Sequence, residues 1–507
     1  MPSDRLVPIA FLLLAVIGCG EPPSPAPTPI RVDTVDPDLW YALVSANPLP
    51  QAFDPSRDAG SAPDPAISIV RVTEPQLRST RSPLEPQEGP AIRVLDRRWL
   101  APAVPLWYSM PPTGAKPRSA AAGLLPLDEI GIPLTAVAVH GRYPGDDDYP
   151  YVEQLVLEFR PSATGLEPES ARLAELWDWF LSVPASNAAP PLIGWIGGVG
   201  DLMVAQGVTE LLDRSDGLHE VFGSVLPIMQ SVDFLMGNLE GAVTTRGTPW
   251  EKTFLFRFHP RVLSHLHRAG FDYLSVVNNH SYDYGEVGFL DTIAHLDASP
   301  IVTSGAGRSL EDARRPYQTD LPGGTRLSIL SVGAYPLERS GFDGARETPA
   351  GPDRPGVLWA GPRNRQAQRD AFEAMRDGFG SDTFNVVMVH GGPEWATEPS
   401  RDQRELYRSF IDAGADLVLG HHSHVVQGLE TYRGGLIAHS LGNYVFPGMY
   451  LTEYGEQSMV LRIGVVAGRI RYVEPIPVRI DHQRLSLDTD DQLRERFSSA
   501  TRVLHGE

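Results

Sequence analysis

A repeated alternation of short apolar runs and helical patterns between residues 192 and 428 constrains the fold of this chain more than any other sequence feature. Short apolar runs are followed by small or polar residues, and helical patterns such as "HPRVLSHLHRAG" and "SRDQRELYRSFIDAG" lie between them. Strands that alternate with helices indicate βαβ units and a mainly parallel sheet. The runs are "PLIGWIGGVGDLMV", "VDFLMGNLEG", "FDYLSVVNNHSYDYG", "TRLSILSVGAY", "FNVVMVHGGPEW" and "ADLVLGHHSHV". We therefore predict an α/β fold for this region.

The last run ends in three histidines, His421, His422 and His424. Successive side chains of an extended segment alternate between faces, so His422 and His424 are predicted to point the same way. Ligands of open α/β sheets bind beyond the carboxyl ends of the strands. A lone histidine is more often an ordinary core or surface residue, but a His-x-His pair at this place predicts two imidazole metal ligands.

Other strand ends carry residues of the same chemistry. These residues are Asp201, Asn238, Glu240, Asn279, His280 and His390. A mixed set of nitrogen and oxygen donors suits one or two Mn, Fe or Zn ions better than Ca or Mg, which take oxygen almost alone. Taken singly, Asp201 could cap a helix and the asparagines could be turn residues. Together, at successive strand ends, they predict a metal centre.

In order and spacing, these segments resemble the CapA family, a capsule-synthesis and poly-γ-glutamate-associated group of the calcineurin-like metallophosphatase superfamily. The resemblance covers about residues 193–450 and implies a four-layer αββα sandwich with its site at the strand ends. The segments that carry it are "GVGDLM", "GNLEG", "NNHSYDYG", "HGGPEW", "GADLVLGHHSHVVQG" and "HSLGNYVF".

The resemblance also implies a role for individual residues. His280 matches the histidine that protonates the leaving group, Asp283 could orient its ring, and His421 has no implied ligand role. Glu240 stands where the superfamily has a bridging aspartate. The implied metal ligands are Asp201, Glu240, Asn279, His390, His422 and His424.

Three positions depart from the pattern. The wider superfamily opens with Asp-x-His, but Met203 takes the place of that histidine, which removes one ligand. Glu240 is longer by one methylene than the aspartate that it replaces, and Gly391 stands where CapA proteins often carry an aromatic residue. Each departure could weaken metal loading or alter substrate geometry.

Five further residues are candidates for binding substrate. Lys252 and Arg257 lie in the segment "EKTFLFRFHPR", which could grip an anionic substrate or could form a solvated basic patch. The candidates are Asn238, Lys252, Arg257, Glu394 and Asn443.

The N-terminus predicts export. Arg5 precedes the apolar run "LVPIAFLLLAVIG", which is shorter than the roughly 20 residues of a membrane span. The stretch "AVIGCGEPPSPAPTP" resembles a bacterial lipobox around Cys19, the only cysteine of the chain, so no disulfide forms within it. We predict a lipoprotein signal peptide at residues 1–19, a proline-rich tether at 20–30, and a lipid anchor on Cys19 in the cell envelope. The alternative is an ordinary signal peptide with an incidental cysteine.

Between the tether and the α/β region lies a proline-rich segment with isolated strand-like runs such as "AISIVRV". We interpret residues 31–185 as a separate α+β accessory domain. Its end weakly resembles part of a phosphate-type solute-binding domain, and an unrelated domain is the alternative. The stretch "VPASNAAPP" reads as a linker before a CapA-like domain at 192–485, and a helix is predicted at 486–507.

Two functions remain open at this stage. A net charge of −20 argues against nucleic-acid binding, which needs a basic surface. The first hypothesis is a metal-dependent, phosphoesterase-like hydrolase that acts in capsule or poly-γ-glutamate metabolism on an anionic polymer or phosphoester. The second is a non-catalytic, membrane-anchored scaffold that binds an anionic polymer. The sequence does not predict an oligomeric state.

Overall fold

The computed structural model describes residues 193–488 apart from 206, 450, 451 and 453, together with Leu493, Arg496, Thr501 and the backbone of eight strands between residues 30 and 159. The signal segment, Cys19, residues 20–29 of the tether and the linker at 183–191 lie outside the described residues. The chain divides into two compact units. They are residues 1–106 with 122–129 and 136–191, and residues 107–121 with 130–135 and 192–507.

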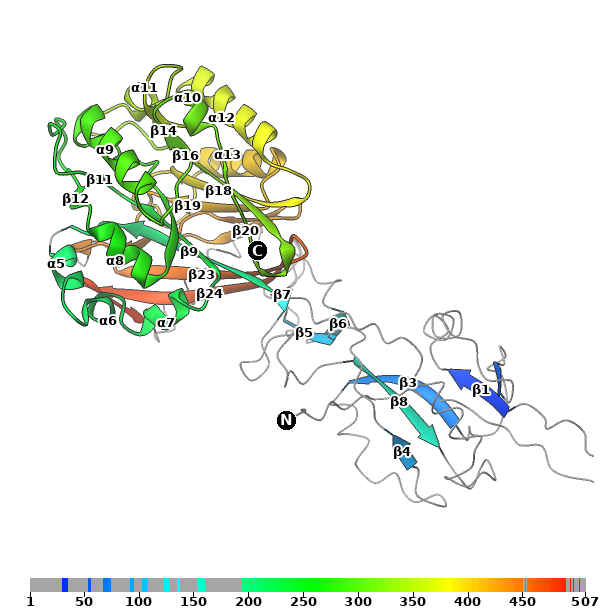
Figure 1. The fold of residues 1–507 in the computed structure, drawn as a ribbon. Coiled ribbons are helices and arrows are strands. Elements are labelled where there is room, and N and C mark those ends of the chain that lie inside the picture. The colour runs from blue at the N-terminus through cyan, green and yellow to red at the C-terminus, as the bar shows by residue number, and fades with distance from the viewer. Residues whose placement is uncertain are drawn as a thin grey trace, which may run out of the picture. The chain divides into compact units, whose positions relative to one another are not determined.

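The second unit contains two large sheets (Figure 1). The first sheet has the order β13-β10-β9-β23-β24-β25, and β22 also pairs with β9. β13, β10, β9 and β22 run parallel to their neighbours, whereas β23 joins β9 antiparallel. Its strands are β9 (Gly194–Leu202), β10 (Phe234–Leu239), β13 (Phe271–Ser275), β22 (Asn443–Val445), β23 (Gln457–Val466), β24 (Arg469–Asp481) and β25 (Arg484–Leu487).

The second sheet has the order β15-β16-β18-β19-β21-β20, with four parallel strands between two antiparallel edge strands. Its strands are β15 (Tyr317–Asp320), β16 (Arg326–Ala334), β18 (Thr383–Gly391), β19 (Leu417–His421), β20 (Leu429–Tyr432) and β21 (Gly435–Ala438). All six strands predicted from the apolar runs are present, and the mainly parallel arrangement is confirmed.

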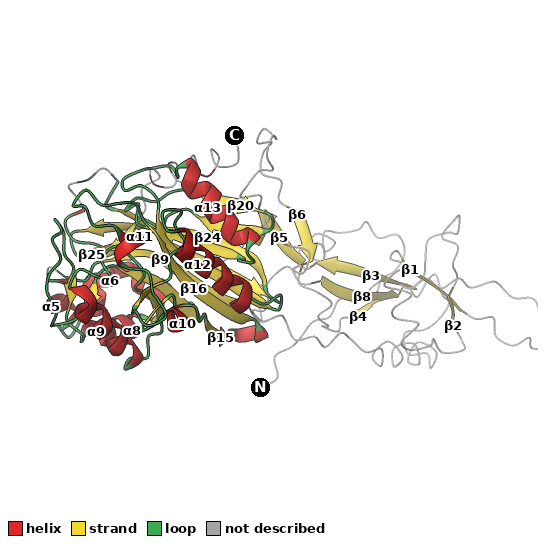
Figure 2. Cartoon of the chain, turned by 90° about the horizontal axis from the view of Figure 1, so that it is seen from above, coloured by secondary structure: helices red, strands yellow, loops and turns green. Residues whose placement is uncertain are grey.

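Helices cover the outer faces of the two sheets (Figures 1 and 2). Those packed on the first sheet are α5 (Val208–Leu212), α6 (Gly217–Phe222), α7 (Leu226–Met229), α8 (Val262–Ala269) and α9 (Gly285–Asp297). Beside the second lie α10 (Leu310–Ala313), α12 (Arg365–Gly378) and α13 (Arg401–Asp412). The short helix α11 (Gly344–Glu347) follows β16 and buries Ala345 in the cluster of the first sheet. The side chains of Asn364 and Ser400 cap α12 and α13 by accepting from backbone N–H groups, which fixes where these two helices begin.

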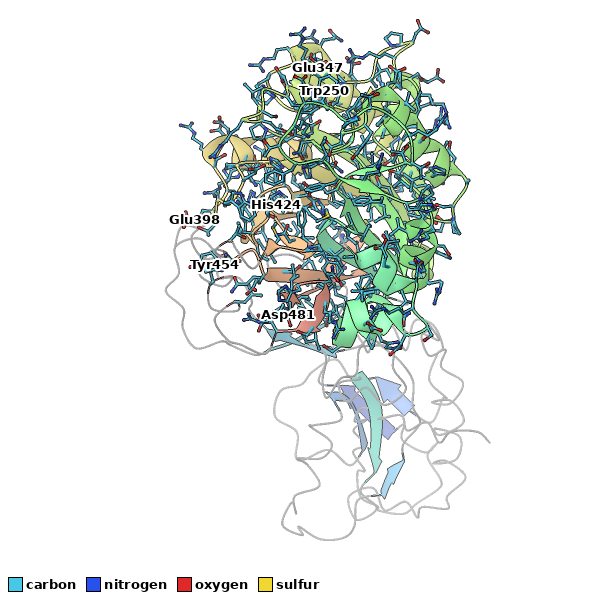
Figure 3. All side chains as sticks on the ribbon, turned by 90° about the vertical axis from the view of Figure 1, so that its left-hand side faces the viewer. Trp250, Glu347, Glu398, His424, Tyr454 and Asp481 are labelled. Atoms are coloured by element: carbon cyan, nitrogen blue, oxygen red, sulfur yellow. The ribbon has the colours of Figure 1, made fainter. Side chains whose placement is uncertain are left out.

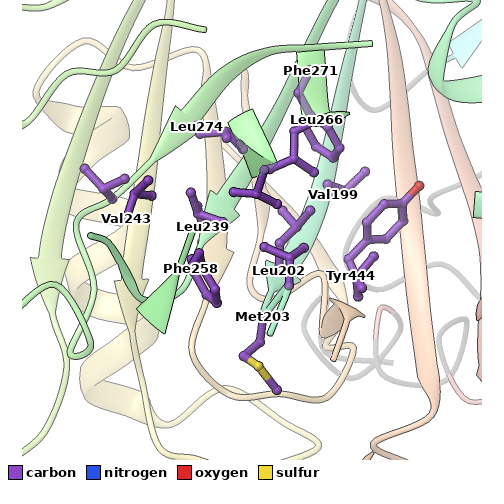
Figure 4. Packing of buried hydrophobic residues seen from close by; sticks show 14 of the residues in the cluster. Val199, Leu202, Met203, Leu239, Val243, Phe258, Leu266, Phe271, Leu274 and Tyr444 are labelled. Atoms are coloured by element: carbon purple, nitrogen blue, oxygen red, sulfur yellow. The ribbon is translucent and has the colours of Figure 1, made fainter. Parts of the chain in front are cut away.

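Alternation along the strands explains why the sheets stack. On β18, Phe384, Val386 and Met388 enter the core between the two sheets, while Val387 and Val389 enter the core beneath α12 and α13. Strands buried on both faces read as continuous apolar runs, which is what the sequence of β18 shows. A third cluster, part of which is drawn in Figure 4, fills the space between the first sheet and α5–α9. The predicted four-layer αββα sandwich is confirmed.

Two glycines let the backbone segments at the strand ends approach one another. A Cβ on Gly200 would lie 2.0 Å from the carbonyl oxygen of Gly442, and one on Gly420 would lie 2.1 Å from that of His439. Any side chain at either position would force these segments apart. The polar residues that follow each glycine are thereby held at one edge of the sandwich.

The C-terminal part of the described chain begins with a hairpin of two long strands, β23 and β24. Its two-residue turn, Ala467–Gly468, has φ of 49° and 72°, as tight hairpin turns require. The final helix was predicted from residue 486, but β25 extends to Leu487, so that boundary is wrong. The β-pairing of Ser486 with Arg479 explains the difference.

The strands described between residues 30 and 159 form a five-stranded and a three-stranded sheet. The run "AISIVRV" is β3 (Ile67–Thr73), which pairs antiparallel with β8 (Glu153–Phe159). The other strands are β1 (Ile30–Thr34), β2 (Phe53–Pro55), β4 (Ile92–Val94), β5 (Ala103–Trp107), β6 (Gly123–Pro126) and β7 (Thr135–Ala136). Among the described residues, no helix is long and apolar enough to cross a membrane.

Candidate metal centre

The carboxyl ends of β9, β10 and β13 in one sheet and of β18 and β19 in the other meet at one edge of the sandwich. The side chains that converge there are Asp201, Asn238, Glu240, Asn279, His280, His390, His422 and His424, and none is more than 7% exposed. They come from segments far apart in the chain, so only the fold brings them together. His424 is labelled among the side chains of the second unit in Figure 3.

Asp201 is fixed by hydrogen bonds from both sheets. Its Oδ1 accepts from the amide of Asn238 at 2.8 Å, and its Oδ2 accepts from the backbone N–H of His422 at 3.1 Å. The Asn238 amide also lies 3.2 Å from Nδ1 of His390. Asn238, a substrate-binding candidate from sequence, therefore contacts the ligand candidates directly.

Glu240 follows β10 and is completely buried. Neither of its carboxylate oxygens has a hydrogen-bond partner among the described residues. Oε1 lies 3.8 Å from Nε2 of His280, 4.0 Å from Nε2 of His390 and 3.8 Å from Nε2 of His424. A buried carboxylate without a partner is costly, and a cation bound among these rings would remove that cost.

His422 and His424 converge on the centre by a different route from the one predicted. β19 ends at His421, and the backbone φ angles of His422 and His424 are 88° and 60°, so the segment is not extended. Strict alternation would send the His422 ring toward α13, on the face of Val418. The positive φ turns it back, so that its ring centre lies 4.7 Å from that of His390. The prediction that both rings face one side because of strand alternation is wrong.

Both rings nevertheless have free nitrogen donors at the centre. His422 is 2% exposed, and neither of its ring nitrogens has a hydrogen-bond partner among the described residues. Nδ1 of His424 lies 3.0 Å from Oδ1 of Asn443, which leaves Nε2 as the free nitrogen. Asn443, a predicted substrate residue, thus orients a ligand candidate, as outer-shell partners of metal-binding histidines do.

His421 lies apart from this arrangement. Its Nε2 bonds the backbone carbonyl of Val199 in β9 at 3.0 Å and so links the two sheets. This agrees with the absence of an implied ligand role for His421.

Asn279 contacts both the metal-ligand candidates and a neighbouring loop. Its Oδ1 lies 2.9 Å from Nε2 of His390, and its amide donates to Oε1 of Glu338 at 3.1 Å. Glu338 therefore fixes which way the amide points and directs the oxygen toward His390.

His280 is held by a buried chain of charges. Its Nδ1 lies 2.7 Å from Oδ2 of Asp283, and Nζ of Lys252 lies 2.9 Å from Oδ1 of the same carboxylate. Nζ also lies 2.8 Å from Oε1 of Glu338 and donates to the Asn279 carbonyl at 2.8 Å. The Lys252 side chain is 1% exposed, so it supports the site from within rather than from its mouth.

The remaining substrate candidates lie at the surface. The guanidinium of Arg257 stacks over Tyr284 at 4.5 Å, and Arg257 is exposed. Glu394 is also exposed, and its carboxylate lies close to His422 and His424. Met203, at the position where the superfamily pattern has histidine, is 1% exposed within the apolar cluster of the first sheet (Figure 4). It contributes packing and no donor to the centre.

Burial and neighbouring charges shift the pKa values of the titratable groups at the centre in opposite directions. Burial and the charge of Asp201 raise the pKa of Glu240 well above its ordinary range. Burial and the charge of His424 lower the pKa of His422 to about 3. Burial also lowers the pKa of His424, but Glu240 and Asp201 outweigh it and bring the value to about 9. A proton on His424 thus balances charge where a metal cation would otherwise do so.

The pKa values of the other two histidines are lowered. Burial and the charges of the neighbouring histidines hold the pKa of His390 well below its usual value. Burial and Lys252 lower the pKa of His280, and the hydrogen bond with Asp283 opposes them. Neutral imidazoles are the form in which histidine binds a metal.

The donors form two groups, in each of which the ligand atoms all lie within 4.8 Å of one another. One contains Asp201, Glu240 and His390, and the other contains Glu394, His422 and His424. Carboxylate oxygens mixed with imidazole nitrogens suit Mn, Fe or Zn. The partnerless oxygens of Glu240 and nitrogens of His422 fit such an ion, so the residues present can hold metal.

Sequence reasoning missed three residues around the centre. Glu338 orients Asn279, Tyr335 packs its ring 5.8 Å from that of His390, and Trp395 packs 5.1 Å from that of His424. Tyr335 and Glu338 follow β16, the one predicted strand whose end carries no ligand candidate. The position of that end beside β18 was the only signal that could have drawn attention to them.

Known proteins resemble this chain over the same region. Residues 196–448 match the family described as "Bacterial capsule synthesis protein PGA_cap". The chain is 32% identical to the PGA biosynthesis protein CapA of Bacillus subtilis and 31% identical to the capsule biosynthesis protein CapA of Bacillus anthracis, over 49% of its own length. These matches span only 62% and 58% of the two Bacillus proteins.

A third relative is matched over more of its length. The chain is 30% identical over 299 residues to a probable polyglutamine synthesis accessory protein of Mycobacterium tuberculosis. That match covers 55% of this chain and 77% of the relative. The sandwich, the order of its site segments and these matches agree, and the chain belongs to the bacterial capsule synthesis protein PGA_cap family.

Proposed function

We propose that this protein is a metal-dependent hydrolase of the cell envelope that acts in the synthesis or processing of a capsular or poly-γ-glutamate-type polymer. The observation that carries the proposal is the pairing of donors and acid at one edge of the sandwich. Buried, partnerless donors on Glu240 and His422 lie beside a His280–Asp283 pair that can deliver a proton. A purely structural cluster would leave no reason to bury such donors unpaired.

The donor set fits Mn, Fe or Zn better than Mg or Ca. An ion held there would polarise a substrate oxygen and activate water as a nucleophile at neutral pH. Asp201 and Glu240 would balance its positive charge. Asn238, Asn443 and Glu338 would keep the ligand side chains in place, because each contacts one of them directly.

His280 is placed to act as the general acid. Asp283 holds Nδ1, so Nε2 faces Glu240 at 3.8 Å and points toward the group that would be bound there. A proton on Nε2 can pass to the oxygen or nitrogen of the leaving group as the bond to it breaks. The neighbouring carboxylate stabilises the charged ring, and Lys252 fixes that carboxylate in turn.

The names of the relatives suggest the substrate class. Two Bacillus relatives are named for PGA or capsule biosynthesis, and the mycobacterial relative for polyglutamine synthesis. We propose an anionic polymer or a phosphoester as substrate. If the polymer is poly-γ-glutamate, an amide becomes a second type of scissile bond. The lipobox around Cys19 supports export and anchoring in a membrane.

The test is an activity screen of the purified protein loaded with Mn or Zn. Phosphomonoesters, phosphodiesters and γ-glutamyl peptides would each be offered with and without the ion. We expect metal-dependent hydrolysis of at least one of these classes. His280→Ala should hydrolyse that substrate much more slowly when the leaving group needs a proton. A protein that binds metal and an anionic polymer, yet hydrolyses none of these substrates, would instead support the scaffold hypothesis.

A further inference from the structure

The second group of donors contains one residue that lies outside the buried centre. Its members are His422 and His424, from the turn after β19, and Glu394, from the loop after β18, with all ligand atoms within 4.8 Å of one another. His422 is only 2% exposed, and neither of its ring nitrogens has a hydrogen-bond partner among the described residues. An unpartnered imidazole nitrogen within 4.8 Å of a carboxylate oxygen is the arrangement that a shared cation would satisfy.

The loop that carries Glu394 is fastened to the histidine turn at two points. The N–H of Trp395 donates to the Ser423 carbonyl at 2.8 Å, and the side-chain amide of Gln427 donates to the Ala396 carbonyl at 2.7 Å. The Trp395 ring also packs 5.1 Å from the ring of His424. Glu394 is therefore an exposed side chain on an anchored backbone, so its carboxylate stays close to the two rings.

The first strand supplies one carboxylate to this side of the centre, Asp201, whose Oδ2 lies 3.5 Å from Nδ1 of His424. Asp201 accepts hydrogen bonds from Asn238 and from the His422 backbone, and Met203, two residues later, is buried in the apolar core. A cation beside His422 and His424 would share Glu240 with the donor group of Asp201 and His390, since Oε1 of Glu240 lies 3.8 Å from Nε2 of His424. The Oδ2 atom of Asp201 already accepts from the His422 backbone N–H, and Glu394 is the further carboxylate whose oxygen lies within 4.8 Å of both imidazoles.

We propose that Glu394 is a metal ligand that completes a second cation position with His422 and His424. The inference rests on the metal centre of the proposed function and assigns Glu394 to the ion rather than to the substrate. Because Glu394 comes from an exposed loop, this second position is open to solvent on one side. It is therefore the position at which ions enter and leave more readily.

The test is calorimetric titration of the metal-stripped full chain with Mn²⁺ alone, with bound metal confirmed by elemental analysis. We expect wild-type protein to bind two ions with different affinities. Glu394→Gln removes the charge and keeps the shape, and it should weaken the second binding step by at least about tenfold while leaving the first unchanged. Glu394→His restores a donor and should recover part of the loss.

Glu398→Gln is the matched control, because Glu398 is an exposed glutamate on the same loop and projects at the surface (Figure 3). It should bind both ions as wild type does. Unchanged titration of Glu394→Gln, with wild-type protein binding metal normally, would overturn the role of Glu394 and leave the metal centre standing. Failure of the wild-type protein to bind any ion would overturn both. Glu394 is exposed, so neither of its variants should alter the melting temperature, which is checked alongside.

Discussion

Nδ1 of His280 and Oδ2 of Asp283 lie 2.7 Å apart, and both side chains are buried beside the candidate ligands without belonging to either donor group. This separation of a proton-delivering pair from the metal-binding donors lets the two roles be tested independently. It also sets the first prediction.

His280→Ala should lower the hydrolytic rate by about 10²–10⁴-fold, the usual contribution of general acid catalysis. Bound metal should stay near the wild-type level, because the ring is not among the proposed ligands. The loss should be smaller for a nitrophenyl ester, whose leaving group needs no proton. Rates and metal content are measured on the same preparations, and loss of metal from His280→Ala would contradict the assignment.

Lys252 and Glu338 supply the second prediction, because their buried ion pair supports both Asp283 and Asn279. Lys252→Met removes the cation that two carboxylates share and should lower the free energy of unfolding by about 3–5 kcal/mol. The double variant Lys252→Met/Glu338→Gln should lose less than the sum of the single variants, by about 0.5–3 kcal/mol. Chemical denaturation of all four proteins completes the cycle. Strict additivity would show that the pair does not act as a unit.

The strands and the strand-end ligands could be predicted from sequence because both depend on local patterns. Apolar runs long enough to be buried on both faces predicted β18 and β19, and the resemblance to CapA proteins indicated which residues follow them. The positive φ angles of His422 and His424 could not be read in this way. Left-handed backbone at a non-glycine residue is unfavourable, and it persists only where tertiary contacts enforce it.

The residues that hold the ligand side chains in place could not be predicted from the sequence either. The sequence indicates that Lys252 could grip substrate or form part of a solvated basic patch, but the fold buries it between Asp283 and Glu338. Nothing in either segment records this pairing, because the two loops meet only after the sheets have stacked. Glu338 was missed for the same reason. Asn443, which the sequence predicts as a substrate residue, orients His424 in the structure.

Glu430 gives a prediction about acid stability. Burial raises the pKa of this carboxyl, but hydrogen bonds from His439 and Arg408 outweigh it and bring the value to about 2, below the ordinary 4.5. A lowered carboxyl pKa stabilises the fold above pH 4.5, and that stability is lost as the pH falls from 4.5 toward 2.

Glu430→Gln should therefore lower the free energy of unfolding at pH 7 by about 1–3 kcal/mol. This range includes the weakening of the ion pairs by solvent around the partly exposed arginines. The stability of the variant should also change less than that of wild type below pH 4.5. Denaturation across the pH range measures both effects. Glu405→Gln, in an exposed pair with Arg401, is the control and should change stability by less than about 1 kcal/mol. Equal effects of the two variants would contradict the account.

Cys19 supplies a prediction about location. Several acyl chains on one cysteine anchor a protein stably, whereas a single chain binds a bilayer only marginally. Cys19→Ala should leave the precursor unprocessed or release the protein from the membrane fraction. Fractionation with lipid labelling in a bacterial host distinguishes these results from normal anchoring. Normal lipid labelling of the variant would exclude Cys19 as the anchor.

The metal content of the purified protein tests the central claim most directly. Elemental analysis of wild-type protein should find one or two Mn, Fe or Zn ions per chain, and His422→Ala should lose at least one of them. His421→Ala is the matched control: its ring bonds the Val199 carbonyl, so the variant should melt at a lower temperature but keep its metal. A clean, folded wild-type protein that holds no transition metal, even after incubation with these ions, would contradict the account.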